Sequence, residues 1–346
     1  MRDDGLPLAA PRVYPSVDFH RDGVQHGFLK VPHSHDASAW GAVMIPITVI
    51  RRGDGPVALL TGGNHGDEYE GPIALSRLAN TLRARDVSGC VIVIPFMNAP
   101  AVLAGTRTSP LDGGNLNRAF PGRVDGSVTE RIADYFSRCL IPLADVVVDI
   151  HSGGRTLDFV PFAAIHELPD AAQQARCEAA MHAFGAPYSL RMRDPDPHGL
   201  YDTAAETQGR VFVTTELGGG GSASARSVGI AHRGVYGVLV HAGIVPHDVA
   251  QRDGASPVPD LPSVQLSMPD GDCYVTSEHA GLLEMCHDLG ARVRRGAIVA
   301  RVHDVTRTGT APVEYRAARD GMLIGRHFPG RVGTGDTLCV LADVQA

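Results

Sequence analysis

The chain of 346 residues has a single lysine, Lys30, and shows no long apolar run, no basic stripe and no Cys-x-x-Cys spacing. Without a run of bilayer length, and with no apolar signal region in residues 1–7, we expect neither a membrane partner nor secretion. Scattered arginines in a chain of formal net charge -7 argue against a nucleic-acid partner. Six cysteines, mostly within apolar stretches, indicate reduced thiols in a cytoplasmic protein.

Strand and helix patterns alternate along the first 250 residues. An apolar content of 44% is ample for a core, and the length fits one large or two ordinary domains. Periodicity predicts an edge strand or hairpin arm at 42–50, further strands at 57–61, 91–94, 144–150 and 210–216, and helices at 73–82, 127–140, 171–184 and 223–242. The alternation predicts an α/β fold with a mixed, mainly parallel sheet and helices on both faces.

A proline-rich stretch, residues 251–263, predicts a linker between two units. Before it we expect a larger domain at 46–250, with residues 1–45 as an N-terminal lead packed on it. After it, residues 264–346 contain two similar halves, which resemble those of a biotinyl/lipoyl-type β-sandwich. Because Lys30 is the only lysine, this β-domain cannot carry biotin or lipoate, which leaves a scaffold, lid or oligomerisation role.

Two predicted strand ends carry the ligand types of a catalytic zinc site. One strand is followed by His65 and Glu68, and another ends in His151. Two imidazoles and one carboxylate leave a coordination position on zinc for water. Because open α/β sheets build their sites at strand ends, we expect the three side chains to converge. Read alone, His65 with Glu68 also fits a polar turn whose imidazole bonds to backbone groups.

The stretch between the two metal segments carries candidate substrate-binding groups. Residues 107–122 form a loop rich in turn formers that includes Arg107, Asn117 and Arg118. Arginine presents a planar fork that grips a carboxylate or a developing oxyanion through two bonds, so Asn117 and Arg118 look like a carboxylate clamp. The alternative is a surface loop with solvated arginines and with asparagines that favour turns.

Glu216 ends an apolar strand and is followed by four glycines. A carboxylate at a strand end beside a metal can take a proton from the attacking water and pass it to a leaving amine. The alternative is a charged strand terminus next to a flexible turn. His198 and Tyr201 lie on a later loop that could line the same pocket, so they are candidate substrate-binding residues.

Four ordered motifs resemble those of the succinylglutamate desuccinylase/aspartoacylase family, relatives of the zinc carboxypeptidases. They are His65-Gly-Asp-Glu68, Asn115-Leu-Asn117-Arg118, Asp149-Ile-His151 and Thr215-Glu216-Leu217-Gly218. The resemblance covers about residues 46–250 and implies a zinc carboxypeptidase-like fold in a catalytic domain with one Zn²⁺ per chain. The zinc ligands that it implies are His65, Glu68 and His151.

The resemblance also implies roles for the other candidates. Glu216 would be the base that activates water, Arg107 would polarise the scissile carbonyl, and Asn117 with Arg118 would bind the substrate carboxylate. The chain departs from the family pattern at Asn115, where relatives usually have an aspartate. That aspartate is an outer partner of a zinc histidine, and an amide there donates less negative charge to the ring.

Residues 98–101 and 115–122 further resemble the bacterial deacetylases that include the N-acetyl-diaminobutyrate deacetylases. We therefore expect a zinc-dependent hydrolase that cleaves the amide bond of a small N-acyl amino acid. Two alternatives stay open: a metallocarboxypeptidase that acts on peptide C-termini, and a non-catalytic zinc-stabilised binding protein. The sequence also leaves room for a homo-oligomer.

Overall fold

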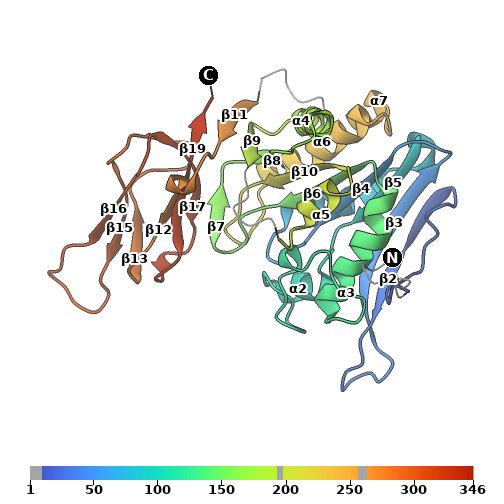
Figure 1. Cartoon of the computed structure of the whole chain (residues 1–346), viewed down its shortest axis with the longest axis horizontal. Coiled ribbons are helices and arrows are strands. Elements are labelled where there is room, and N and C mark those ends of the chain that lie inside the picture. The colour runs from blue at the N-terminus through green and yellow to red at the C-terminus, as the bar shows by residue number, and fades with distance from the viewer. Residues whose placement is uncertain (1–9, 193–197, 256–262, 346) are drawn as a thin grey trace.

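The computed structural model of the chain describes residues 10–192, 198–255 and 263–345. A broad α/β body forms one side of the molecule, and a β-rich C-terminal unit forms the other (Figure 1). Within the described residues, fifteen strands join in one mixed sheet and four form a separate antiparallel sheet. The chain therefore has the α/β architecture that the alternating pattern predicts, with an all-β unit after it.

The helices and strands have the following bounds. The strands of the α/β body are β1 (Tyr14–Pro15), β2 (Gly23–Pro32), β3 (Ala42–Arg52), β4 (Val57–Gly62), β5 (Gly89–Ile94), β6 (Val146–His151), β7 (Leu157–Phe159), β8 (Phe162–His166), β9 (Tyr188–Met192) and β10 (Val211–Glu216). The helices are α1 (Glu70–Thr81), α2 (Ala99–Ala104), α3 (Val128–Tyr135), α4 (Ala171–Phe184), α5 (Tyr201–Glu206), α6 (Ala225–His241) and α7 (His247–Arg252). The C-terminal strands are β11 (Val264–Ser267), β12 (Tyr274–Thr276), β13 (Gly281–Met285), β14 (Arg292–Val293), β15 (Ile298–His303), β16 (Val313–Arg316), β17 (Gly321–His327), β18 (Arg331–Val332) and β19 (Thr337–Val344).

The large sheet has the order β1-β2-β3-β5-β4-β6-β10-β8-β9-β11-β19-β17-β14, with β12 on β19 and β7 on β17. Parallel pairing holds for β5-β4-β6-β10 and for β8-β9-β11, and the other neighbours are antiparallel. The prediction of a mainly parallel sheet is therefore right for the centre only. The β2–β3 hairpin and the C-terminal strands that follow β11 extend the sheet by antiparallel pairing, which requires no crossover helix.

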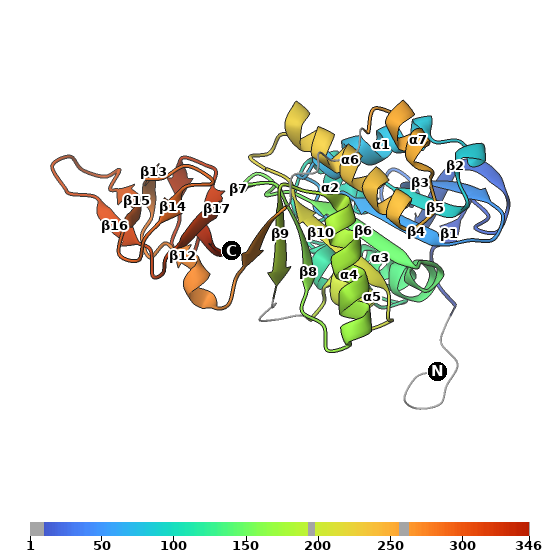
Figure 2. The ribbon, with the colours of Figure 1, turned by 90° about the horizontal axis from the view of Figure 1, so that it is seen from above.

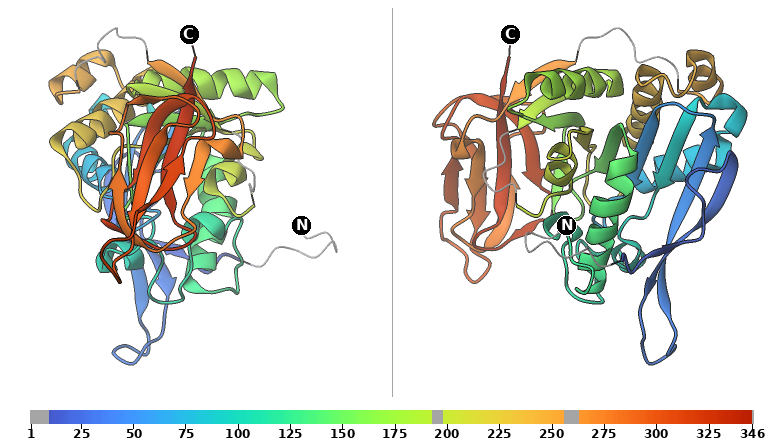
Figure 3. Two further views of the ribbon diagram at one scale, coloured as in Figure 1. Left: turned by 90° about the vertical axis from the view of Figure 1, so that its left-hand side faces the viewer. Right: turned by 45° about the vertical axis from the view of Figure 1, so that its right-hand side comes forward.

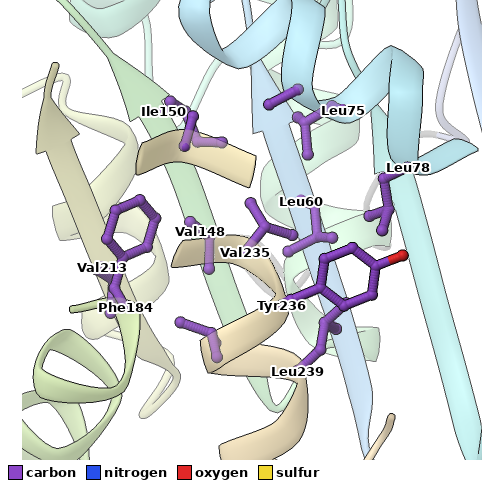
Figure 4. Packing of buried hydrophobic residues seen from close by; sticks show 14 of the residues in the cluster. Leu60, Leu75, Leu78, Val148, Ile150, Phe184, Val213, Val235, Tyr236 and Leu239 are labelled. Carbon is purple, nitrogen blue, oxygen red and sulfur yellow. The ribbon is translucent and has the colours of Figure 1, made fainter. Parts of the chain in front are cut away.

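The central strands are buried on both faces, as parallel strands require. Leu60, Val148 and Val213 point to one face, where they pack against α1, α4 and α6 (Figure 4). Figure 2 shows α4 and α6 lying over this face of the sheet. Alternate residues of the same strands, such as Leu59 and Phe212, point to the opposite face with α3 and α5. Side chains at the strand ends then follow the same alternation, which decides the face on which each polar group appears.

Local capping explains why α3 begins where the sequence predicts a helix. The Ser127 side chain accepts a hydrogen bond from the backbone of Glu130, and the Glu130 carboxylate accepts one from the Ser127 backbone N–H at 2.8 Å. This reciprocal capping box satisfies two donors that a helix start leaves unpaired. The predicted helix at 127–140 is a regular helix only to Tyr135, and a π-helical segment, Phe136–Leu140, completes it.

The predicted edge strand or arm at 42–50 is β3, and it is one strand of a long hairpin with β2. It is not an edge strand, because β5 pairs with its other side from Thr48 to Arg52. The first residues of the predicted linker, 251–252, end α7, and residues 256–262 lie outside the described ranges. The domain boundaries at 46, 251 and 264 stay a prediction.

The C-terminal unit shares the large sheet with the α/β body. β11 pairs in parallel with β9 and antiparallel with β19, and β7 pairs with β17. Apolar residues from both parts, including Phe162, Leu190, Ile324 and Val340, form one buried cluster at this junction. Further apolar residues of the C-terminal strands form a cluster of their own around Leu323 and Leu341.

All six cysteines are free of disulfide bonds. Four of them, Cys90, Cys177, Cys273 and Cys339, are buried, and Cys139 and Cys286 are partly exposed. Among the helices in the described parts of the chain, none is both long and apolar enough to cross a membrane.

Candidate active site

The polar side chains of interest gather where the central parallel strands end. β4 ends at Gly62 and leads into the loop that carries His65 and Glu68, while β6 ends at His151 and β10 at Glu216. Glu216 lies in register with His151, so both side chains leave the sheet on the same face. The predicted candidates from three distant segments therefore meet at one edge of the sheet.

Glu68 stands between the two candidate histidines. His65 Nδ1 lies 2.7 Å from Glu68 Oε1, and His151 Nδ1 lies 2.8 Å from Glu68 Oε2. The two rings are 5.1 Å apart between centroids, and all three side chains are buried. One nitrogen of each ring and one carboxylate oxygen lie within 4.8 Å of one another, which is a spacing that a single metal ion can bridge.

The far nitrogen of each ring faces a fixed acceptor. His151 Nε2 lies 2.7 Å from Asp149 Oδ2, and His65 Nε2 lies 3.2 Å from Asn115 Oδ1. The amide of Asn115 is oriented by the backbone N–H of Asn117, which donates to the same Oδ1 at 3.0 Å. Each Nε2 therefore carries the hydrogen, so that in a neutral ring the Nδ1 atom is an acceptor.

This arrangement fits a bound cation. Two acceptor nitrogens face the carboxylate oxygens of Glu68 at 2.7 and 2.8 Å, and such contacts repel unless protons or a metal ion lie between them. Although burial works in the opposite direction, the charges of His65 and His151 hold the pKa of Glu68 well below its usual range. Two imidazole nitrogens and one carboxylate are the donor set of a catalytic zinc site. The oxygens of Asp149 and Asn115 are the kind of hydrogen-bond acceptor that usually orients a zinc-binding histidine.

Arg107 lies at the solvent side of this cluster. Its Nη1 atom is 3.4 Å from His65 Nδ1 and 3.7 Å from Glu68 Oε1, and 53% of the side chain is exposed. The guanidinium therefore places a positive charge beside the candidate ligands, at a point that a small molecule in solution can reach. This is a position from which it can stabilise negative charge on a carbonyl oxygen.

Glu216 is a partly buried carboxylate with spare hydrogen-bonding capacity. Among the described residues, its Oε2 atom has no hydrogen-bond partner. Burial, and after it the negative charge of Glu68, raises the pKa of Glu216 to about 8. A carboxyl group whose pKa is close to neutrality is suited to taking and returning a proton.

The loop that carries Asn117 and Arg118 is joined to the start of α5, whose first residue is Tyr201, so Tyr201 does not lie on a loop as predicted. Asn117 Oδ1 accepts a hydrogen bond from the backbone N–H of Tyr201 at 3.1 Å, and Gly199 O accepts one from Phe120 N at 3.1 Å. The Arg118 guanidinium donates to the Asn117 carbonyl at 2.7 Å and is exposed. Asn117 and Arg118 are therefore neighbours on a braced loop, as a carboxylate clamp requires.

The two later candidates are placed differently. Tyr201 is 0% exposed, and its ring stacks on Phe120 at 4.8 Å and meets Phe136 and Phe212 edge-on. The ring belongs to the core, while the backbone N–H of Tyr201 orients Asn117. His198 is exposed in the short turn before α5, and residues 193–197 lie outside the described ranges.

The structure adds one site residue to which sequence reasoning gave no role. Asp149 accepts hydrogen bonds from Thr61 Oγ1 at 2.7 Å and from Asn64 Nδ2 at 3.0 Å, besides its contact with His151. Although burial raises it, the charge of His151 and these donors lower the pKa of Asp149. The spacing of positions 149 and 151 on one strand was the available signal, since alternate residues face the same side.

Gly66 allows the first metal loop to lie against α2. A Cβ atom on Gly66 would lie 2.0 Å from the carbonyl carbon of Ala101 and 2.3 Å from the nitrogen of Val102. We expect Gly66→Ala to lower the free energy of unfolding by about 1–3 kcal/mol, because backbone must move to admit the methyl group. Urea unfolding measures this effect.

The backbone movement in Gly66→Ala should also displace His65 and Glu68, so this variant should bind less zinc per chain. Gly330→Ala is the matched control, because a Cβ there meets nothing within 4 Å. Equal stability and zinc content in the two variants would show that the close approach at Gly66 is unimportant.

Comparison with known proteins decides the family. The model of the succinylglutamate desuccinylase/aspartoacylase catalytic domain matches residues 54–242. The chain belongs to this family. The resemblance found in the four sequence motifs is thereby confirmed.

Individual members of the succinylglutamate desuccinylase/aspartoacylase family match almost the whole chain. The N-alpha-acetyl-L-2,4-diaminobutyric acid deacetylase of Halomonas elongata is 60% identical over 95% of this chain and 94% of its own length. The product-bound ectoine utilization protein EutE of Ruegeria pomeroyi is 58% identical, with a TM-score of 0.92 over 97% of this chain and all of its own. A succinylglutamate desuccinylase from Silicibacter sp. TM1040 is 57% identical, with a TM-score of 0.92 over 98% of this chain and 100% of its own.

Asn115 is the outer partner of His65, since its Oδ1 atom lies 3.2 Å from His65 Nε2. We expect Asn115→Asp to strengthen zinc binding by about tenfold, because a carboxylate makes the imidazole a better donor. The reverse change at the other ring, Asp149→Asn, should weaken zinc binding by about 10- to 100-fold. Titration against a competing chelator measures both affinities, and equal affinities in the two variants would contradict the assignment of these outer partners.

Proposed function

We propose that the chain is a zinc-dependent deacetylase of small N-acyl amino acids, with Nα-acetyl-2,4-diaminobutyrate as the first candidate substrate. The convergence of His65, Glu68 and His151 beside the partly buried Glu216 is the observation that carries this proposal. The 60% identity to a deacetylase of this substrate supports the choice of acyl group. In this proposal the catalytic part has a zinc carboxypeptidase-like fold, the C-terminal part is a barrel-sandwich-like domain, and the enzyme works in the cytoplasm.

His65, Glu68 and His151 would hold the zinc ion through two Nδ1 atoms and one carboxylate. Bound there, zinc supplies a Lewis acid for amide hydrolysis. Asp149 and Asn115 keep the two rings in the tautomer that offers Nδ1. These residues form the rigid and largely buried floor of the site, and Arg107 lies on its solvent side.

Glu216 is the proposed general base and acid. It takes a proton from water as the water oxygen adds to the acyl carbon, and it later gives that proton to the amine nitrogen as the C–N bond breaks. Arg107 stabilises the negative charge that develops on the carbonyl oxygen. The products are acetate and the free amino acid, so no other reactant is required.

Asn117 and Arg118 are the proposed binding groups for the substrate carboxylate. Arg118 supplies an exposed guanidinium, and Asn117 is held by the backbone of Tyr201. His198, on the loop joined to this pair, is a further proposed contact. This clamp favours amino acids whose carboxylate is free and whose amine carries the acyl group.

A substrate panel tests the proposed function. We expect rapid release of acetate from Nα-acetyl-2,4-diaminobutyrate, slower reaction with N-succinyl amino acids, and no release of C-terminal residues from peptides. Faster cleavage of peptides would favour a metallocarboxypeptidase. Zinc in the preparation without turnover of any substrate would favour a zinc-stabilised binding protein.

A further inference from the structure

The β2–β3 hairpin extends past the edge of the sheet at which the candidate active site lies. β3 pairs with β5 only from Thr48 onward, whereas β2 and β3 remain paired to Pro32 and Ala42. Six residues of β3, 42–47, thus extend beyond the pairing with β5, a length of about 20 Å at 3.3 Å per residue. The right-hand view of Figure 3 shows this hairpin projecting from the body of the molecule. We call residues 27–47 the arm.

The inner and outer faces of the arm differ in burial. Leu29, Val31 and Ile45 are buried on the inner face. On the outer face, Tyr14, Lys30 and Met44 lie in register across three strands. At these positions the sheet therefore presents a second face that no helix in the described ranges covers.

The outer face carries large apolar side chains that are exposed to solvent. Tyr14 is 56% exposed and Met44 40%, and Phe28, two residues from Lys30 on the same face, is 39% exposed. Trp40, in the loop at the tip, is 99% exposed. Aromatic residues and methionine are enriched in protein interfaces, and neighbouring exposed apolar groups mark contact sites.

The tip of the arm has a defined conformation. His33 N donates to Gly41 O at 2.8 Å, and His35 and Ser38 exchange two backbone hydrogen bonds at 3.1 and 2.8 Å. The rings of His33 and His35 stack with centroids 5.5 Å apart. Trp40 is therefore exposed on a loop that has a defined local structure.

We infer that the outer face of the arm is the contact surface for a second copy of this chain. Lys30, at the centre of the apolar row, and Asp36, in the tip loop, are both exposed, and neither forms an ion pair with any described residue. If two arms lie antiparallel across a two-fold axis, Lys30 of each copy faces Asp36 of the other. A two-fold contact of this kind is self-complementary, which is the commonest arrangement in oligomers.

A charge-reversal cycle tests this inference. We expect the unchanged protein to sediment as a dimer, and Lys30→Glu and Asp36→Lys each to raise the dimer dissociation constant by about tenfold or more, because each places like charges together. The double variant, K30E/D36K, should return to within a few-fold of the original value. Leu282→Ala, a truncation at an exposed site on β13, is the matched control and should change nothing.

Trp40 provides an independent readout, because it is the only tryptophan in the chain. Its emission should shift to shorter wavelength as the protein concentration rises through the dissociation constant, and Trp40→Ala should weaken association by about tenfold or more. A monomer at all concentrations would overturn the inference. So would a dimer that Trp40→Ala and both single charge variants leave unchanged, or a blue-shifted emission in a monomer, which would assign the surface to another segment of the same chain.

Discussion

Replacing Glu216 by glutamine is expected to lower kcat by at least about a hundredfold while the protein keeps its zinc. Glutamine has nearly the same shape as glutamate but cannot take a proton from water. Glu216 is not among the three side chains that form the candidate metal group, so its loss should leave the ligands intact. Parallel measurement of kcat and of zinc per chain separates the two effects.

Glu70→Gln is the matched control for this variant. Glu70 is a second carboxylate close to the site, and it is buried and accepts a hydrogen bond from Ser227 Oγ at 3.0 Å. A glutamine there still accepts that bond, so we expect kcat to change by less than about fivefold, since only a structural contact is altered. Near-normal turnover in Glu216→Gln, or an equal loss in both variants, would remove Glu216 from the proposed role.

Removal of the metal, by a chelator or by His151→Ala, is expected to lower activity by at least about a thousandfold, because amide cleavage then lacks its Lewis acid. Added zinc should restore the chelated protein but not the variant. His166→Ala is a matched control, since His166 is also buried and lies 2.8 Å from a carboxylate, that of Glu206, but is outside the cluster. Zinc content should fall only in the His151 variant. Full activity after complete removal of zinc would contradict the proposal.

Zinc affinity should also depend on pH in a defined direction. Although burial lowers it, the charges of Asp149 and Glu68 raise the pKa of His151 well above 6.5. In the metal-free protein at neutral pH the ring therefore holds a proton, which zinc must displace. The affinity should fall as pH decreases, by about tenfold per pH unit for each displaced proton, and calorimetry in buffers of different ionisation enthalpy should detect the released proton. An affinity that does not vary with pH would exclude this competition.

Much of the architecture follows from short-range patterns in the sequence. The apolar runs that became β4, β6 and β10 are buried on both sides, so their composition identifies them as central strands without knowledge of their neighbours. The cap at Ser127 is likewise a local signal. The metal-ligand candidates could be predicted because strand ends bring distant segments to one edge, and because the motifs resemble a known family.

The features that the sequence did not predict depend on long-range contacts. The burial of the Tyr201 ring follows from its packing against Phe120, Phe136 and Phe212, and no local pattern places these rings together. The hydrogen bond from the Tyr201 backbone to Asn117 joins residues that are 84 positions apart. The continuation of the large sheet into the C-terminal unit likewise arises from pairing across separate regions of the chain.

The most direct test of the central claim is X-ray absorption spectroscopy at the zinc edge on protein loaded with about one zinc per chain. The proposed site predicts two imidazole nitrogens and additional oxygen ligands, with no sulfur, and one imidazole fewer around any zinc that His151→Ala still binds. A sulfur ligand, or a spectrum that this substitution leaves unchanged, would contradict the site built from His65, Glu68 and His151.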